Sequence, residues 1–453
     1  MNQSLKPHIK STLLLAYPVA IGYVGYIAMQ VVDNIMIGGL GAVYLAAASV
    51  ANSIFIIIMI AGLGISYAVT PLVAIAIGAG KTSECEKLFK HSIIVNLTAA
   101  IILVVITLLS SNIIHYLNQP PEIVDKAISY CRILGLSILP LMLFQCYKQF
   151  MEGLSSTRPA MIITVLANLI NAFFNWILVY GRYGFPKLEL NGSGLATFFS
   201  RLFMALAILW YFRHSREFNC YSFTLKIKEL SFHFIKKILN IGLPTAFQYI
   251  FEVGSFSAAV IMIGWLGTKQ LAAHQIAINL ASITYMAALG ISSSGAIRVG
   301  NAVGHQDIAE VRKAGFIAII LGASMMFFCA IVLITLRNYL PLLYIKDKEV
   351  ISIASVLLII AAFFQIFDGT QAVGIGVLRG LTDVKGPTII TFIAYWIIEI
   401  PVAYILGFVF HIGVIGVWLG FLTGLFFSAF MLTLRFNKKS RQLVNMYPLD
   451  QLH

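Results

Sequence analysis

Long apolar stretches recur along the whole chain and are separated by short polar segments. A run of about 20 apolar residues is long enough to cross the hydrocarbon core of a bilayer as a helix. Membrane β-barrels need short strands of alternating polarity instead, and the runs here are continuous. The pattern predicts an all-α membrane protein with 12 transmembrane helices, at residues 13–38, 46–77, 92–114, 128–151, 160–181, 192–212, 238–264, 271–298, 314–336, 351–378, 387–410 and 413–434.

The composition supports this interpretation and limits the alternatives. Of the 453 residues, 59% are hydrophobic and 11% are charged, whereas a soluble domain carries about 25% charged residues. The basic N-terminus, residues 1–10, is not followed by a small-residue cleavage motif, so we expect the first apolar run to be retained as a helix. The cysteines are scattered without a CxxC pair, which argues against a disulfide framework or a zinc site; they are Cys85, Cys131, Cys146, Cys220 and Cys329.

The net charge of +13 reflects topology rather than a nucleic-acid surface. With the predicted helices, most of the 31 Lys and Arg residues fall on the side shared by both termini, with a dense group at residues 213–237. Basic residues concentrate in the cytoplasmic loops of membrane proteins. We therefore expect both termini to be cytoplasmic and no nucleic acid to bind.

The two halves of the chain repeat each other. The sequence IMIGGLG at 35–41 matches IMIGWLG at 261–267, and GLGIS at 62–66 matches ALGIS at 288–292. One ungapped offset covers both matches and also pairs Pro18 with Pro244. We expect an N-terminal six-helix lobe at 1–212, a cytoplasmic linker loop at 213–237, a C-terminal six-helix lobe at 238–436 and a cytoplasmic tail at 437–453.

The even number of helices per half sets the relation between the halves. Both halves enter the membrane from the same side, so they are parallel repeats related by an axis along the membrane normal. Transporters of this plan place the substrate cavity between the lobes. A duplicated receptor or channel is the alternative, but two six-helix lobes favour transport by alternating access.

Four carboxylates fall well inside the predicted helices: Asp33, Glu252, Asp368 and Glu399. Charged groups in a bilayer core are costly and usually face a cavity or a transport pathway. We expect no Lys or Arg in the middle of a helix near them, so a simple ion pair is hard to build. Such carboxylates should either hold a proton or bind a cation.

Depth groups one of these acids with three polar residues. At about 1.5 Å per residue, Asp33, Asn175 and Thr197 all lie about 7–8 Å below the outer membrane edge, and Asn171 is one turn from Asn175. These groups supply oxygen ligands for a small cation, or they surround a protonatable Asp. The alternative for the two Asn residues and Thr197 is that they only hydrogen-bond between helices.

The C-terminal half carries a different set of candidates. We expect Glu252 and Asp368 near the middle of the bilayer. Glu399 either joins their cavity or pairs with a neighbouring hydroxyl. Aromatic residues near Glu252 could stack on an organic cation, although most of them are expected to be packing residues. This weaker set of cavity aromatics is Tyr26, Phe247, Tyr249 and Phe251.

The sequence lacks the motifs that metal, ATP or diphosphate chemistry would need. The histidines form no HExxH pattern, and His274 is expected to be a packing residue. The sequence contains no GxxxxGK[ST] phosphate loop and no DDxxD cluster, so we expect neither ATP nor diphosphate chemistry. A membrane-embedded enzyme is therefore disfavoured, and we expect no catalytic residues and no cofactor.

Several segments together resemble the multidrug and toxic compound extrusion (MATE) transporters, specifically their NorM-like bacterial branch. They are VVDNIMIGGLG (31–41), NLINAFFNWILVYG (168–181), GSGLAT (192–197), LPTAFQYIFEVGSF (243–256), LAAHQIAINL (271–280), RVGNAVGHQD (298–307), FQIFDGTQAVGIGVLRG (364–380) and GFLTG (420–424). The resemblance implies two six-helix bundles around a V-shaped cavity, in a bacterial inner-membrane protein that we expect to be monomeric. It also implies export of cationic amphipathic compounds in exchange for Na⁺ or H⁺.

The resemblance also assigns roles to individual residues. It matches Asp33, Asn171, Asn175 and Thr197 to the cation-coupling group of the N-terminal lobe. It matches Glu252 and Asp368 to the second-lobe acids implicated in Na⁺ coupling. Glu399 departs from the family pattern, because its position is usually small and uncharged, and this leaves the choice between Na⁺ and H⁺ open.

Alternating-access antiport is the mechanism we expect from these residues. A lipid-linked oligosaccharide flippase of the same superfamily is the related alternative. That function typically needs a cationic cavity for a diphosphate, whereas the buried charge expected here is anionic.

Overall fold

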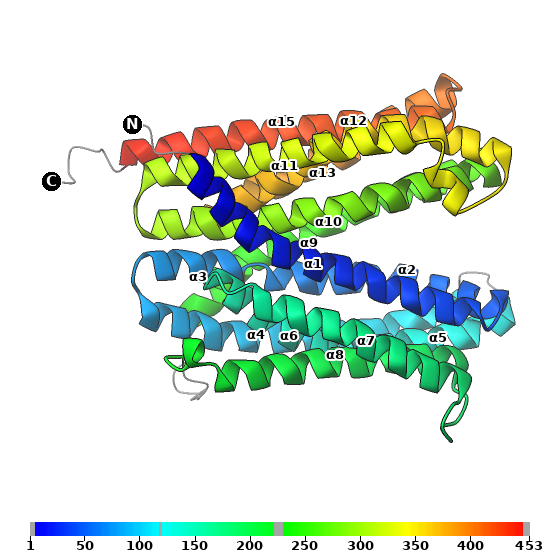
Figure 1. Ribbon diagram of the computed structural model, residues 1–453, viewed down its shortest axis with the longest axis horizontal. Helices are drawn as coiled ribbons and strands as arrows, with labels where there is room; N and C mark the ends of the chain where they lie inside the picture. Colours follow the sequence, from blue (N-terminus) through cyan, green and yellow to red (C-terminus); the bar gives the residue numbers. More distant parts are fainter. Residues whose placement is uncertain (1–4, 117–119, 222–229, 447–453) are drawn as a thin grey trace. The chain divides into compact units, whose positions relative to one another are not determined.

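The computed structural model describes residues 5–116, 120–221 and 230–446, and the regular secondary structure of these residues is entirely helical (Figure 1). The described residues contain 12 helical spans long and apolar enough to cross a membrane. The prediction of an all-α membrane protein with 12 spans is confirmed. The helices are α1 (Leu5–Gly38), α2 (Ala42–Ser66), α3 (Val69–Gly78), α4 (Thr82–Ser110), η1 (Ser111–Tyr116), α5 (Pro121–Leu136), α6 (Ile138–Gly153), α7 (Arg158–Tyr180), α8 (Glu189–His214), η2 (Arg216–Phe218), α9 (Phe232–Leu266), α10 (Thr268–Gly304), α11 (Ile308–Leu336), η4 (Leu340–Leu343), α12 (Lys348–Gly380), α13 (Lys385–Phe392), η5 (Ile393–Glu399), α14 (Ile400–Tyr404), η6 (Ile405–Val409) and α15 (Val414–Met446).

Prolines explain where two predicted helices are broken. The predicted helix 46–77 is divided between α2 and α3 at Tyr67, and the predicted helix 128–151 is divided between α5 and α6 at Ser137. Pro71 follows the first break and Pro140 the second. A proline lacks an N–H and its ring clashes with the carbonyl four residues earlier, so the α-helical hydrogen bonds stop just before it.

The eleventh span is irregular in a different way. Two π-helical segments, η5 and η6, flank the short α14. Pro401 lies two residues after the end of η5, and its ring cannot accommodate a normal helical turn over Ile397. π-Helical turns are rare and occur often at functional positions, and Glu399 is the last residue of η5.

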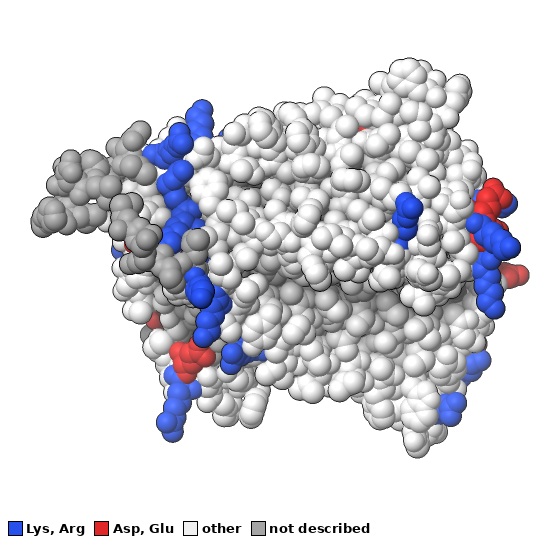
Figure 2. All heavy atoms as spheres, turned by 45° about the horizontal axis from the view of Figure 1, so that its top comes forward, with Lys and Arg blue, Asp and Glu red and all other residues white. Residues whose placement is uncertain are grey.

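The distribution of charged side chains over the surface is typical of a membrane protein. On the face that Figure 2 shows, most Lys and Arg atoms lie toward the helix ends, and the surface between them is almost free of charge. Large apolar side chains are exposed on the surface, including Leu169, Ile320 and Phe328. Apolar side chains outside the core are expected where lipid is the solvent.

The chain divides into two packing units. The N unit comprises Ile21–Val73 and Lys81–Ala246, and the C unit comprises the described parts of Met1–Ala20, Ala74–Gly80 and Phe247–His453. These limits differ from the predicted lobes 1–212 and 238–436, since α1 and α9 each pass from one unit to the other. Of the predicted linker and tail, residues 222–229 and 447–453 lie outside the described residues.

The backbone repeats between the two halves at its turns. Gly41 precedes α2 with φ 119° and ψ 169°, and Gly267 precedes α10 with φ 121° and ψ 167°. Only glycine adopts this conformation without strain. Gly80 and Gln306, also equivalent in the repeat, both have a positive φ, of 68° and 59°. The matching turns fit the duplication inferred from the sequence.

Each unit has its own apolar core. In the C unit, α12 packs against α10, α11 and α15, and Tyr395, Trp418 and Phe421 are fully buried among them. In the N unit, α8 packs against α5, α6 and α7. These contacts hold the polar residues of each unit at fixed positions on packed helices.

Candidate functional site

A buried polar cluster in the N unit surrounds Asp33 of α1. The Asp33 Oδ1 atom accepts hydrogen bonds from Asn171 Nδ2 at 3.2 Å and Asn175 Nδ2 at 2.7 Å. Its Oδ2 atom accepts one from the Thr197 hydroxyl at 3.1 Å. All four side chains are buried, so the structure brings together the four residues that depth had grouped.

Local sequence explains how α1, α7 and α8 form this cluster. Asn171 and Asn175 are one turn apart on α7 and therefore present their amides on one face. Glycines let α1 approach α7 closely, because a Cβ at Gly25 would lie 3.0 Å from Thr164. Near the end of α1, the Tyr180 hydroxyl of α7 donates to the Met36 carbonyl at 2.9 Å.

The cluster has unused capacity to bind a cation or a proton. All three hydrogen bonds to Asp33 come from neutral donors. The Asn175 Oδ1 atom is buried without a hydrogen-bond partner, although buried carbonyl oxygens are usually paired. A small cation or a protonated carboxyl would complete the set of carboxylate and amide oxygens.

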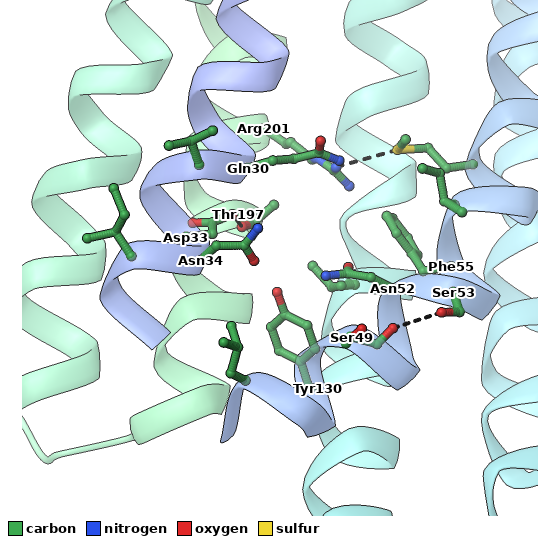
Figure 3. A pocket seen from close by; sticks show the side chains of 16 residues that line it. Gln30, Asp33, Asn34, Ser49, Asn52, Ser53, Phe55, Tyr130, Thr197 and Arg201 are labelled. Carbon is green, nitrogen blue, oxygen red and sulfur yellow. Dashed lines mark hydrogen bonds between the residues drawn. The ribbon is translucent and has the colours of Figure 1, made fainter. Parts of the chain in front are cut away.

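Asp33 and Thr197 also line a pocket of about 730 Å³ that lies within the N unit (Figure 3). A volume of this size suits a drug-sized ligand. The wall is mixed, with Leu45, Phe55 and Met59 on its apolar parts. Its remaining polar lining residues are Gln30, Asn34, Ser49, Asn52, Ser53, Tyr130 and Arg201.

Arg201 corrects one expectation. The prediction that no Lys or Arg lies in the middle of a helix near the carboxylates is wrong, because Arg201 lies near the middle of α8 and lines the Asp33 pocket. No ion pair within 4.0 Å joins it to Asp33 among the described residues. The signal was present in the sequence, as a single Arg in the apolar run FFSRLFMALAILW at 198–210.

A second buried cation lies elsewhere in the N unit. Lys148 of α6 and Glu152, one turn along, are both almost completely buried, with Nζ and Oε1 3.8 Å apart. The ammonium also lies over the rings of Tyr23 and Tyr26, at 4.8 and 5.6 Å from their centroids. The buried charge of this unit is therefore not only anionic, contrary to the argument made against a flippase.

In the C unit, three buried carboxylates interact. Glu252 of α9, Asp368 of α12 and Glu399 of η5 influence one another electrostatically. The Tyr285 hydroxyl donates to Glu252 Oε1 at 2.9 Å, and Glu252 Oε2 has no hydrogen-bond partner. Arg379 also acts on Glu252, which is a further basic residue that the sequence analysis did not place there.

Glu399 is the most buried of the three, with 0% of its surface exposed. Neither of its carboxylate oxygens accepts a hydrogen bond, and the nearby Ser255 hydroxyl donates to the Glu252 carbonyl instead. Gly424 of α15 makes room for it, because a Cβ there would lie 2.7 Å from Glu399 Oε2. Both expectations for Glu399 stay predictions, since it lies near the other two carboxylates and near the Ser255 hydroxyl.

No group of three or more His, Cys, Asp or Glu side chains is arranged to hold one metal ion in the described part of the chain. A Na⁺ ion at Glu252 and Asp368 would therefore need ligands of other kinds, such as hydroxyl or amide oxygens. A proton bound to a carboxylate does not require such a set of ligands.

The candidate aromatic residues are divided between the two units. Phe247 and Phe251 stack at 6.3 Å, Phe251 also contacts Phe392 of α13, and Phe247 is 53% exposed. Tyr249 accepts a hydrogen bond from Arg379 at 3.4 Å. Tyr26 belongs to the N unit, where Gln145 donates to its hydroxyl. Tyr249 acts electrostatically on Tyr285, the residue that donates to Glu252.

Comparison with known proteins identifies the family. The sequence model of the family described as MatE matches residues 18–177 and 244–405, which together cover more than half of the chain. The chain belongs to the MATE family. Its two matched stretches begin at Pro18 and Pro244, the prolines that the repeat pairs.

Similar MATE proteins cover almost the full length. A protein named multidrug resistance protein NorM from Vibrio vulnificus is 33% identical over 96% of this chain and 97% of its own. A NorM protein from Photobacterium profundum is 34% identical over 94% of both chains. These relatives confirm the resemblance to the NorM-like branch.

A solved MATE structure shares the fold. The Vibrio cholerae MATE transporter VcmN, in its bent form, superposes with a TM-score of 0.86 at 19% identity, covering 97% of this chain and 98% of its own. The chain is thus a multi-pass membrane transporter of the MATE family and not an enzyme.

Proposed function

We propose that this MATE protein exports amphipathic organic cations from a bacterial cell in exchange for an inward-moving Na⁺ or H⁺. The names of the NorM relatives support multidrug export. The observation that carries the coupling is the buried Asp33 cluster, in which a carboxylate has only neutral hydrogen-bond donors. A membrane-embedded carboxylate in that setting needs a positive partner, and a mobile cation supplies it.

Competition for carboxylates then gives exchange by alternating access. A cation bound at Asp33, or in the acidic group of the C unit, disfavours a positively charged drug at the same charge. Drug loaded from the cytoplasm displaces the cation, and cation loaded from outside favours release of the drug. Two ligands that each weaken the binding of the other are thermodynamically linked. Exchange requires no ATP, and we propose that the protein acts as a monomer in the inner membrane.

Neutralising the carboxylates tests this function. We expect Asp33→Asn combined with Asp368→Asn to reduce exchange by at least about tenfold, because the charge shared by ion and drug is gone. The measurement is the efflux of a cationic dye from proteoliposomes under an imposed Na⁺ or H⁺ gradient. Replacing one gradient by the other identifies the coupling ion.

A surface carboxylate serves as the matched control. Asp125 of α5 is exposed, so Asp125→Asn should leave exchange unchanged. Both variants must retain the wild-type unfolding temperature in detergent. Undiminished exchange by the double variant would refute the proposed coupling sites.

A further inference from the structure

A groove of about 580 Å³ lies on the surface of the C unit, between the N-terminal part of α1 and the helices α10 and α11. Its lining is mostly apolar and includes Leu13 and Leu14 of α1, Ala287 and Ile291 of α10 and Met325 of α11. Leu13 and Leu14 are 46% and 45% exposed. The groove is therefore open to the surroundings of the protein, which at a membrane-spanning segment are lipid.

Contacts on the opposite face of α1 hold this wall of the groove in place. Arg298 of α10 donates to the His8 carbonyl at 2.9 Å and to the Thr12 hydroxyl at 2.7 Å. Further along, α1 and α10 approach so closely that a Cβ on Gly290 would lie 2.6 Å from the Ala16 carbonyl oxygen. The groove is thus formed between helices that are packed against each other.

Two lysines lie at one end of the groove. Lys6 and Lys10 of α1 both line it, are exposed, and are one turn apart on the same helix face. No ion pair is found for either of them in the described part of the chain. By contrast, Arg298 is paired with Glu310 at 2.7 Å. The free positive charge at this end of the groove therefore comes from the two lysines.

The length of the groove matches one leaflet of a bilayer. Lys10 and Ala20 both line it, and ten residues of α-helix extend about 15 Å, which is half of a hydrocarbon core of about 30 Å. The first membrane span runs from Lys6 to Gly38, so Ala20 lies near its middle and the two lysines at its beginning. The lysines are therefore at the level of lipid headgroups, and the apolar lining is at the level of the acyl chains of one leaflet.

Tyr17 adds a polar atom between these two levels. Its side chain lines the groove and is 40% exposed, and its hydroxyl has no hydrogen-bond partner within the described residues. Helical side chains lean toward the N-terminus of their helix, which directs this hydroxyl back toward the lysines. The ester carbonyls of a phospholipid lie between its phosphate and its chains, where they can accept this hydrogen bond.

We propose that the groove binds one anionic phospholipid of the leaflet on the N-terminal side, with its phosphate on Lys6 and Lys10 and one acyl chain along the apolar lining. Basic pockets between membrane helices bind anionic headgroups. A zwitterionic lipid carries its own compensating cation, so the lysines favour the anionic lipid over it. The same charges disfavour an organic cation, and the bound lipid is a partner of the fold and not an exported substrate.

Native mass spectrometry of the purified full-length protein tests this site. Phosphatidylglycerol and phosphatidylcholine with identical acyl chains are added separately to the delipidated protein in detergent, and the dissociation constant of the first bound lipid is measured. We expect the wild type to bind phosphatidylglycerol about tenfold more tightly than phosphatidylcholine. Lys6→Gln combined with Lys10→Gln should weaken phosphatidylglycerol binding about tenfold and change phosphatidylcholine binding less than about twofold.

Two further variants separate the groove from general surface charge. Lys236→Gln combined with Lys438→Gln is the matched control, because it removes the same charge from two exposed lysines outside the groove, and Lys236 is the repeat partner of Lys10. The control should leave both dissociation constants within about twofold. Ala287→Phe places a ring in the apolar part of the groove. It should weaken phosphatidylglycerol binding about tenfold although every lysine remains, because the ring displaces buried methylene groups of the acyl chain.

Each contrary result overturns the inference. Equal affinities of the wild type for the two lipids, or an unchanged phosphatidylglycerol affinity in the Lys6 and Lys10 variant, would exclude recognition of the phosphate by these lysines. Equal weakening by the control variant would make the attraction a general property of the basic surface. Undiminished binding by Ala287→Phe would place the lipid outside the groove. A lipid-free dimer that Ala287→Phe dissociates would make the groove an interface between two copies of the chain.

Discussion

At the scale of single residues, the N unit and the C unit differ in the hydrogen bonds that their buried carboxylates accept. Asp33 accepts three hydrogen bonds, whereas neither oxygen of Glu399 accepts one. A buried carboxyl without donors is costly in its charged form. The two sites should therefore differ in how tightly they hold a cation, although the halves that carry them are repeats.

The Thr197 hydroxyl offers a conservative test of the Asp33 site. Thr197→Val keeps the side-chain shape and removes one donor to Asp33 Oδ2. Because that donor competes with a cation for the same oxygen, we expect the ion concentration for half-maximal dye efflux to fall, by about threefold to tenfold. The measurement is an ion titration in proteoliposomes.

Thr164→Val is the control for this change. The Thr164 hydroxyl is buried on α7 and donates to the Ala160 carbonyl of its own helix, so its loss should leave the ion dependence unchanged. A rise in the half-maximal concentration for Thr197→Val would instead mean that the threonine oxygen binds the cation directly.

At the scale of helices, glycine determines where repeat-related elements meet in the C unit. A Cβ on Gly304 of α10 would lie 2.2 Å from the Ile75 carbonyl oxygen, and one on Gly78 of α3 would lie 2.2 Å from the Asn301 carbonyl oxygen. Gly78 and Ile75 are the repeat partners of Gly304 and Asn301. The two crossings are therefore one interaction made twice.

Substitution of these glycines should weaken the crossing. Gly304→Ala places a methyl group against backbone atoms that cannot move aside, so we expect a loss of about 1–3 kcal/mol in stability. The readout is a lower unfolding temperature in detergent. In contrast, a Cβ at Gly22 of α1 meets nothing within 4 Å, and Gly22→Ala should stabilise the helix by about 0.5–1 kcal/mol. Equal effects of the two variants would contradict this view of the crossing.

At the scale of the whole molecule, the distribution of basic residues predicts the orientation in the membrane, and a native cysteine can test that prediction. Cys220 is exposed, whereas Cys85, Cys131 and Cys146 are buried. Cys220 lies in the basic segment 213–237 that the positive-inside pattern assigns to the cytoplasm. An impermeant maleimide should label it in inside-out vesicles and not in intact cells.

The control for labelling is Cys220→Ser, which should remove nearly all of the signal in inside-out vesicles. The partly exposed Cys329 lies within α11, where lipid keeps out a polar reagent. Labelling of Cys220 in intact cells would reverse the predicted orientation of both termini.

The sequence by itself determined the class of the protein, the number of its spans, the repeat and the family. Each of these depends on local patterns, because membrane helices satisfy their own backbone hydrogen bonds and must be apolar over about 20 residues. The grouping of Asp33 with Asn171, Asn175 and Thr197 was also predictable, since helical rise converts position into depth.

Only the tertiary structure decided which side chains share a pocket. Depth says nothing about the direction in which a helix face points, so Arg201 was overlooked, although it is one turn from Thr197. The passage of α1 and α9 between units likewise depends on packing against other helices. Residues distant in sequence make those contacts, and one-dimensional periodicity does not encode them.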